Sequence, residues 1–309
     1  MTQTTNSKVI VIPPDCTDLD GYACAVGYAE LLRARGIDSL AGYDGPVDAE
    51  TSYVVSCITP PIFESNKNIV NASKYVYVDG SNLQLFPEAL SPNKVVEVID
   101  HHFPHDVKND FPNAIEDIQR IGAAATLIVE RFKEDTRTPE HGTSVLLYCA
   151  IHSNTQGLNG SITTQRDHDA VDWLSSITNI PKDIVKLQFN ARKADIVSNL
   201  SASVARESKK YYDQLSREYV IAQLELPDAS LVFNEERDEL IKSTLSLSER
   251  AILNMVDVSK NESTILIPND TYRSEVEELI GMTFTNSCAI ASPIILRKQI
   301  VAAIAGNKW

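Results

Sequence analysis

Short apolar runs alternate with helix-like segments along the first half of the chain, and this alternation limits the possible folds more than any other feature. Four runs have the length and composition of buried strands: Lys8–Ile12, Ser52–Ile58, Lys74–Val78 and Val95–Ile99. Helical spacing of apolar residues is found at 22–35, where Gly36 ends the pattern, and again at 122–132 and 144–150. Alternating βα units predict an α/β fold with a mostly parallel sheet and helices on both faces.

The second half predicts a smaller α/β domain. The segment Ala191–Ser201 breaks the helical periodicity and is interpreted as a linker. It divides the chain into an N-terminal domain at 1–190 and a C-terminal domain at 202–309. In the C-terminal part we expect helices at 202–216, 236–258 and 272–282 and strands at 219–226, 263–267 and 294–304.

Composition indicates a cytoplasmic protein with no membrane partner. The chain has 309 residues, of which 43% are apolar, enough for two domains with sizeable cores. No stretch approaches the roughly 20 consecutive apolar residues of a membrane helix, and the polar segment Met1–Ser7 lacks the apolar core of a signal peptide. The five cysteines are scattered and form no C-x-x-C pair, which argues against a disulfide framework and a thiolate zinc site.

The acidic charge balance disfavours a nucleic-acid partner. Formal net charge is −14, and no run of Lys and Arg is longer than two residues. Proteins that grip a nucleic-acid backbone usually present a basic patch. A small anionic substrate is still compatible with this charge, because bound metal ions reverse the local sign.

Acidic and histidine residues follow three of the predicted strands. The Asp18-Leu-Asp20 motif comes after the first strand, Asp79 directly follows Lys74–Val78, and Asp100-His101-His102 directly follows Val95–Ile99. In an open α/β sheet the carboxyl ends of the strands are where ligands bind. We therefore expect these side chains to converge on one spot.

Carboxylate and imidazole ligands suit Mn²⁺ or a similar divalent ion. Two such ions about 3.5–4 Å apart hold both the nucleophile and the leaving oxygen of a phosphoryl displacement. Taken singly, an Asp-x-Asp motif is more often a turn or a helix cap, and a His-His pair is more often part of a polar surface. Only the combination of three strand ends indicates a metal site.

The segments around these residues resemble the DHH phosphoesterases, and more closely the manganese-dependent (family II) inorganic pyrophosphatases and their exopolyphosphatase relatives. KVVEVIDHHF at 94–103 resembles the motif that gives the superfamily its name. The first, second and fourth motifs of the family are matched by VIPPDCTDLDG at 11–21, YVYVDGSN at 75–82 and AIHSNTQGL at 150–158. The basic C-terminal motif is matched by ILRKQIVAAI at 295–304. The resemblance implies a DHH domain, a smaller C-terminal domain and an active site in the cleft between them.

The resemblance also implies roles for individual residues. Asp79 would bridge two metal ions as part of a ligand set made of Asp18, Asp20, Asp79 and His101. Asp100 would orient His101, and His102 would contact a substrate phosphate. In the C-terminal domain the implied phosphate-binding residues are Lys210, Arg297 and Lys298, with a register uncertain by one residue because Leu296 lies at the position of a family arginine.

Three positions depart from the family pattern. Pro14 replaces a histidine ligand, Gly80 replaces the histidine of the second motif, and Asn154 replaces an aspartate ligand. An amide oxygen can bind a hard cation but brings no charge, and one pair of unit charges about 4 Å apart is worth about 4 kcal/mol at an effective dielectric near 20. At least one of the two metal positions is therefore expected, with Asn154 as a neutral ligand and with Mn²⁺, Co²⁺ or Mg²⁺ as the ion.

These expectations imply hydrolysis of a phosphoanhydride, with inorganic pyrophosphate as the first substrate. A short polyphosphate or a nucleotide-type phosphoester is the second choice. The three departures keep open a degenerate homologue that binds metal or phosphate without turnover. Homodimers that pair sheet edges are usual in the resembled family.

Overall fold

The computed structural model describes residues 8–15, 17–43, 45–59, 63–64 and 69–306. These residues form two compact units that are described separately. The first comprises the described residues up to Leu158 together with 162–188, and the second comprises 159–161 together with the described residues from Phe189 onward. None of the described helices is both long and apolar enough to cross a membrane.

A six-stranded parallel sheet forms the centre of the first unit. Its strands follow the order β3-β2-β1-β4-β5-β6. Their bounds are β1 Val9–Ile12, β2 Ser39–Gly42, β3 Phe63–Glu64, β4 Lys74–Val78, β5 Val95–Asp100 and β6 Ile115–Ile118. Every neighbouring pair runs parallel, which confirms the predicted sheet.

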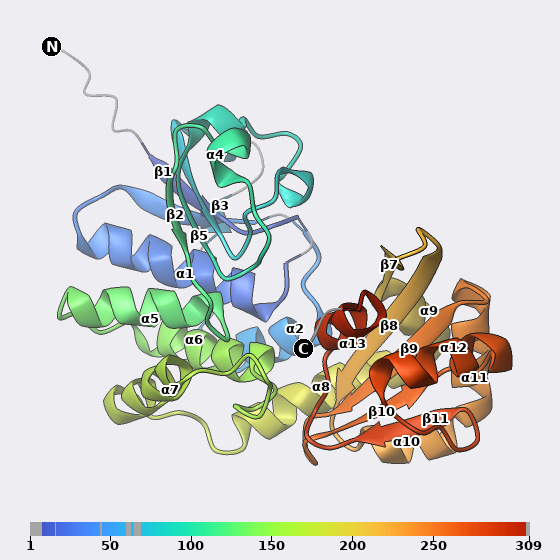
Figure 1. Ribbon diagram of the computed structural model, residues 1–309. Coiled ribbons are helices and arrows are strands. Elements are labelled where there is room, and N and C mark those ends of the chain that lie inside the picture. The colour runs from blue at the N-terminus through green and yellow to red at the C-terminus, as the bar shows by residue number, and fades with distance from the viewer. Residues whose placement is uncertain (1–7, 16, 44, 60–62, 65–68, 307–309) are drawn as a thin grey trace, which may run out of the picture. The chain divides into compact units, whose positions relative to one another are not determined.

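Alternate residues of the central strands enter two separate cores. Val9, Val11, Val76 and Val78 pack in a cluster with α1, α5, α6 and α7, which lie together on one face of the sheet (Figure 1). These helices are α1 Leu19–Ala34, α5 Ala124–Glu134, α6 His141–Asn154 and α7 Gln165–Ile177. Ile10, Ile12, Tyr75 and Tyr77 pack on the other face, in the core that contains Val107 of α4 (Val107–Asp110). Burial on both faces explains why the strands read as continuous apolar runs.

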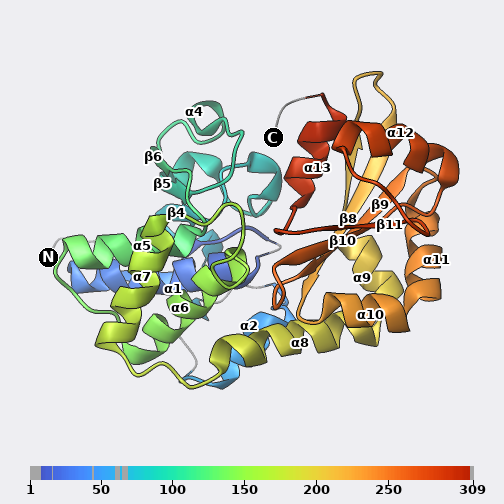
Figure 2. The ribbon, with the colours of Figure 1, turned by 60° about the horizontal axis from the view of Figure 1, so that its bottom comes forward.

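The second unit is built on a five-stranded mixed sheet in the order β11-β10-β9-β8-β7. The strands are β7 Ser208–Tyr212, β8 Glu218–Leu226, β9 Ala251–Asp257, β10 Glu262–Leu266 and β11 Cys288–Ala291. β8 and β9 pair in parallel, and the other pairs are antiparallel. Its two apolar cores contain Ile196 of α8 (Ile184–Ser198) and side chains of five further described helices, namely α9 Leu200–Arg206, α10 Ala229–Glu235, α11 Arg237–Leu247, α12 Asp270–Ile280 and α13 Arg297–Ile304. As Figure 2 shows, α12 and α13 lie on one side of this sheet and α9, α10 and α11 on the other.

Two segments predicted as strands are helices. Residues 52–58 fall mostly within α2, Ala49–Ser56, whose start is capped by the Asp48 carboxylate accepting from the backbone N–H of Thr51. A short apolar run does not distinguish a strand from a buried helix, and here the cap decides. Residues 294–304 contain α13, in which buried Ile300, Ala303 and Ile304 recur at helical spacing.

Three other predictions of secondary structure also differ from the structure. The segment Ala191–Ser201, interpreted as a linker, is almost wholly helical, since α8 spans Ile184–Ser198 and α9 begins at Leu200. The helix expected at 202–216 is the rest of α9 followed by the strand β7. The long helix expected at 236–258 is α11 followed by the buried strand β9. In these segments the apolar residues alone were ambiguous, and packing within the unit determines the result.

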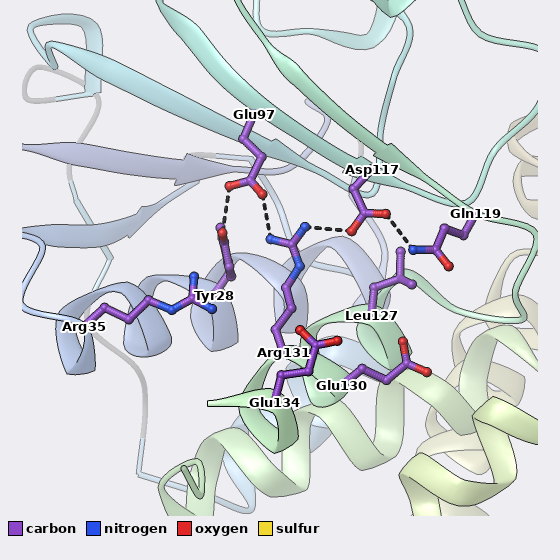
Figure 3. A pocket seen from close by; sticks show the side chains of 9 residues that line it. All are labelled: Tyr28, Arg35, Glu97, Asp117, Gln119, Leu127, Glu130, Arg131 and Glu134. Carbon is purple, nitrogen blue, oxygen red and sulfur yellow. Dashed lines mark hydrogen bonds and ion pairs between the residues drawn. The ribbon is translucent and has the colours of Figure 1, made fainter. Parts of the chain in front are cut away.

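The side of the sheet that faces α5 carries an ion-pair network at β5 and β6. Arg131 of α5 donates to Glu97 of β5 and Asp117 of β6, with both distances 2.7 Å, and Tyr28 of α1 donates to Glu97 at 2.7 Å. Figure 3 shows the Arg131 guanidinium between the two carboxylates, in a polar pocket of about 310 Å³. The Arg131 side chain is only 15% exposed, so one cation joins two strands and two helices.

We expect Arg131→Met to destabilise the first unit by about 2 kcal/mol. The substitution keeps the aliphatic stem but leaves two half-buried carboxylates without their counter-charge, and partial exposure reduces the usual cost of about 3–5 kcal/mol. Urea denaturation followed by circular dichroism measures the change. Arg35→Met is the matched control. Arg35 pairs with Asp135, and the two side chains are 32% and 24% exposed. This substitution should lower the free energy of unfolding by less than about 1 kcal/mol. Equal losses in the two variants would contradict a special role for Arg131.

Candidate metal centre

The carboxyl ends of three adjacent strands bring the predicted residues together. β1, β4 and β5 are neighbours in the sheet. Asp100 is the last residue of β5, Asp79 directly follows β4, and Asp20 lies in the first turn of α1, the helix that follows β1. In the part of the chain that the structure describes, the atoms of Asp79, Asp100, His101 and His102 that can bind a metal all lie within 4.8 Å of one another. Four of the six side chains expected to converge are therefore close together, whereas Asp18 and Asp20 lie outside this set.

His101 presents an unprotonated nitrogen to this cluster. Its Nδ1 lies 3.0 Å from the carbonyl oxygen of Ile121, and a carbonyl only accepts, so Nδ1 carries the proton. The opposite nitrogen, Nε2, is 3.5 Å from Asp79 Oδ1 and 4.0 Å from Asp20 Oδ2. It is buried and has no hydrogen-bond partner among the described residues. Burial lowers the pKa of His101, which keeps this lone pair available for a cation.

Asp79 is held in an unusual backbone conformation beside this lone pair. Its φ is +54°, and its N–H donates to the carbonyl of Ile99 on β5 at 2.8 Å. The side chain is buried, and within the described ranges its Oδ1 accepts no hydrogen bond. Burial first, and then the charges of Asp20 and Asp18, raise the pKa of Asp79 well above its usual range. A cation at this point would relieve that repulsion.

Asp20 is a fully buried residue in the first turn of α1. Its carboxylate lies against the N-terminus of α5. The N–H groups of Ala124 and Ala125 donate to its two oxygens, each at 2.8 Å, and the amide of Asn154 also donates to Oδ2. Burial and the neighbouring Asp18 nevertheless raise the pKa of Asp20 to about 7. The helix N-terminus stabilises a negative charge here, and Asp20 is therefore anchored without a cation.

Asp18 and Asn154 have structural roles that sequence alone left open. Asp18 is the N-cap of α1, where its Oδ1 accepts from the N–H of Asp20 at 2.9 Å and of Gly21 at 3.3 Å. Its carboxyl also lies within hydrogen-bonding range of Asp79. Asn154 is the last residue of α6. Its side-chain amide N–H donates to Asp20, so the N–H, and not the side-chain oxygen, faces the cluster.

Asp100 orients His102, whereas the resemblance had implied that it orients His101. Asp100 Oδ1 accepts from His102 Nδ1 at 2.8 Å and from the backbone N–H of His101 at 2.7 Å. Burial alone would raise the pKa of Asp100 and lower that of His102. The hydrogen bond between them outweighs burial, so the pKa of Asp100 is lowered and that of His102 is raised. The carbonyl of Ile121 takes over the orientation of the His101 ring. A backbone carbonyl leaves no signal in the sequence, so this contact could not be predicted.

Other polar residues near the motifs do not join the cluster. Asp15 and His152 are absent from the described side chains that could together hold an ion. Asp15 is exposed. His152 is buried in α6 with no hydrogen-bond partner for either ring nitrogen in the described chain, and burial lowers its pKa to about 4. His152 is therefore a neutral histidine packed inside the helices of the first unit.

The three predicted basic residues of the second unit lie on two elements, β7 and α13. Lys210 projects from β7 to Glu218, with Nζ 3.1 Å from the carboxylate. Arg297 begins α13 and donates to the carbonyl of Glu207 at 2.6 Å, and Lys298 follows it as an exposed residue. Lys209, which the sequence analysis did not select, lies on the opposite side of β7 from Lys210. Desolvation and the charge of Arg297 lower the pKa of Lys209.

Comparison with known proteins confirms the predicted resemblance. No family model matches the chain. A probable manganese-dependent inorganic pyrophosphatase of Bacillus licheniformis is 22% identical over 298 residues, covering 95% of this chain and 96% of that protein. The manganese-dependent inorganic pyrophosphatase of Bacillus subtilis is 24% identical over 307 residues, covering 96% and 97%. The likeness therefore extends over nearly the full length of these relatives.

Two solved structures share the fold. The putative family II inorganic pyrophosphatase of Methanococcus jannaschii superposes with a TM-score of 0.68 at 19% identity, covering 96% of this chain and 99% of that one. An exopolyphosphatase-related protein from Bacteroides fragilis gives a TM-score of 0.51 at 12% identity, covering 96% and 90%. The chain has an α/β fold of the pyrophosphatase and exopolyphosphatase type and resembles the DHH superfamily.

Proposed function

We propose that this chain is a metal-dependent phosphohydrolase that cleaves a phosphoanhydride, with inorganic pyrophosphate as its first substrate. The observation that carries the proposal is the convergence of His101 Nε2 on Asp79 Oδ1 at 3.5 Å and on Asp20 Oδ2 at 4.0 Å. Two of these three buried atoms have no hydrogen-bond partner within the described residues. The likeness to manganese-dependent pyrophosphatases adds the reaction class and the substrate.

The side chains present fit one divalent ion. Two carboxylates and a neutral imidazole are suitable ligands for Mn²⁺, Co²⁺ or Mg²⁺. Asp20, Asp79 and His101 would hold this ion, with Asn154 beside them. When bound, the ion supplies Lewis-acid chemistry to a phosphate oxygen and to water. A second ion is left with only Asp18 and Asp79, because Pro14 has no ligand atom.

The other residues of the centre handle protons and phosphate charge. His102 has an exposed side chain, its Nδ1–H is held by Asp100, and its pKa is raised. It is therefore suited to donate from Nε2 to a phosphate oxygen. In the second unit Lys210, Arg297 and Lys298, together with Lys209, are the proposed phosphate-binding residues.

A phosphate-release assay tests this function. The purified chain is given pyrophosphate, tripolyphosphate and a panel of nucleotides with Mn²⁺, Co²⁺ or Mg²⁺, and again with EDTA. We expect release from pyrophosphate that needs the metal and stops in EDTA. Preferential release from tripolyphosphate or from a nucleotide would instead support the exopolyphosphatase or phosphoesterase alternative.

A non-catalytic homologue is the second candidate, and Pro14, Gly80 and Asn154 are the observations that favour it. It predicts metal binding by calorimetry with no release of phosphate from any compound of the panel. That result would exclude the hydrolase and keep the metal centre.

A further inference from the structure

Asp167 is a fully buried carboxylate for which the proposed function has no role so far. It lies in the first turn of α7, where it accepts from the backbone N–H of Thr164 at 2.7 Å and from the Thr164 hydroxyl at 2.8 Å. Thr164 and Asp167 form the capping box that begins α7. Two further hydrogen bonds lead from Asp167 to the start of α5 and to the loop before it. The capping of α7 does not explain these two bonds.

The first of them reaches the peptide group that holds His101. Asp167 Oδ2 accepts from the N–H of Gly122 at 3.0 Å. The carbonyl of Ile121, which lies 3.0 Å from His101 Nδ1, belongs to the same peptide bond as that N–H. Because a peptide bond is planar and trans, its N–H and its C=O point in opposite directions and turn together. Holding the Gly122 N–H therefore fixes the carbonyl that orients the His101 ring.

The second bond holds the other end of the same segment. The Thr126 hydroxyl donates to Asp167 Oδ1 at 2.6 Å. Between Gly122 and Thr126 lie the two backbone N–H groups that donate to Asp20. The contact at Gly122 is close, since a Cβ atom there would lie only 2.7 Å from Asp167 Oδ2. One carboxylate thus holds the backbone groups that contact two of the proposed metal ligands.

We propose that Asp167 is a positioning residue of the metal centre that acts on His101 through the peptide group between Ile121 and Gly122. A carboxylate that accepts from a peptide N–H polarises the peptide and makes its carbonyl oxygen a stronger acceptor. A stronger bond at Nδ1 fixes the tautomer of the His101 ring and makes Nε2 a better electron-pair donor. The inference rests on the proposed function for the metal-binding role of Nε2, whereas the chain of hydrogen bonds is independent of turnover.

Asp167→Asn tests the proposal because it removes the charge and keeps the shape. In the metal-free protein we expect the Nδ1–H proton of His101, identified by its loss in His101→Gln, to exchange with solvent at least about fivefold faster in the NMR spectrum, as weakening of one hydrogen bond predicts. Calorimetric titration should show Mn²⁺ binding about tenfold weaker, the lower end of the range for groups that orient a metal-bound histidine. Unchanged exchange of this proton would overturn the proposal, whether or not the chain is a hydrolase. Faster exchange in a chain that releases no phosphate would support the positioning role and count against the proposed function alone.

Two control variants separate this role from the capping of α7 and from the loss of any charge. Thr164→Ala removes the cap hydroxyl and should lower the melting temperature without changing His101 exchange or Mn²⁺ affinity. Asp169→Asn removes the same charge at an exposed position of α7 and should change none of the three quantities. An equal effect of Thr164→Ala and Asp167→Asn on the His101 proton would identify the loss of the cap as the cause and would overturn the proposal.

Gly122→Ala tests the same contact from its other end, and decides the matter if Asp167→Asn does not fold. The added Cβ atom would press on Asp167 Oδ2 and, at 2.6 Å, on Thr155 Cγ2. Because the peptide must then move away from Asp167, the His101 proton should again exchange faster. A folded Gly122→Ala variant with unchanged His101 exchange would contradict the link through this peptide.

Discussion

Asp79→Asn is expected to abolish turnover while raising the thermal stability of the metal-free protein. Asp79 is buried, its Oδ1 has no partner among the described residues, and the charges of Asp20, Asp18 and Asp100 oppose its ionisation. An amide of the same shape removes that repulsion. Asparagine is also one of the few residues that adopt a positive φ readily, so the backbone at +54° is preserved. With Asp79→Ala, the effect of losing the carboxylate could not be separated from the effect of backbone strain at a positive φ.

The magnitudes follow from the lost charge. One unit charge about 4 Å from a cation is worth about 4 kcal/mol at an effective dielectric near 20, which corresponds to roughly a thousandfold loss in metal affinity or in kcat/KM. Relief of the repulsion should raise the melting temperature in EDTA by about 2–4 °C. Calorimetric titration with Mn²⁺, phosphate release and thermal melts in EDTA measure the three quantities.

Asp15→Asn is the matched control for this substitution. Asp15 lies in the same first motif but is exposed and outside the clustered ligand atoms. It should bind Mn²⁺ and turn over like the parent chain. Full activity in Asp79→Asn, or an equal loss in both variants, would refute the assignment of Asp79 as a ligand.

Three of the six strands of the first-unit sheet, β1, β4 and β5, could be predicted because they are buried on both faces. Lys74–Val78 and Val95–Ile99 are apolar at nearly every position, and the structure contains them as β4 and the greater part of β5. The same rule failed at Ser52–Ile58, where the N-cap at Asp48 selects a helix. It also missed β6, whose sequence IEDI is too polar to give a strand pattern because this strand lies at the edge of the sheet.

Some groups of the candidate site could likewise be predicted from the sequence motifs, whereas others could be identified only from the fold. Residues at the ends of neighbouring parallel strands must converge, so Asp79 and His101 could be selected from the sequence. The carbonyl of Ile121 and the N–H groups of Ala124 and Ala125 could not. Both kinds of group belong to the backbone of a distant loop and helix, and backbone groups leave no residue-specific signal in the sequence.

Asn154→Asp should make the protein less stable than the parent chain without metal and more stable than the parent chain with metal. In the structure the Asn154 amide donates to Asp20 Oδ2, which is also 4.0 Å from the lone pair of His101. A carboxylate at position 154 removes this donor and adds a second negative charge beside Asp20, whose pKa is already about 7. We expect the metal-free variant to lose about 2 kcal/mol relative to the parent chain.

With metal the same charge becomes favourable. A fourth ligand that carries a full negative charge should tighten Mn²⁺ binding by about 100-fold, within the roughly 4 kcal/mol available to one charge pair at this separation. Asn154→Asp should therefore melt below the parent chain in EDTA and above it in saturating Mn²⁺. Asn179→Asp adds the same charge at an exposed position and should change neither curve. If the variant melts lower in both conditions and its Mn²⁺ affinity is unchanged, position 154 does not face the ion, and the ligand set would have to be drawn from Asp79, His101 and Asp18 without Asp20.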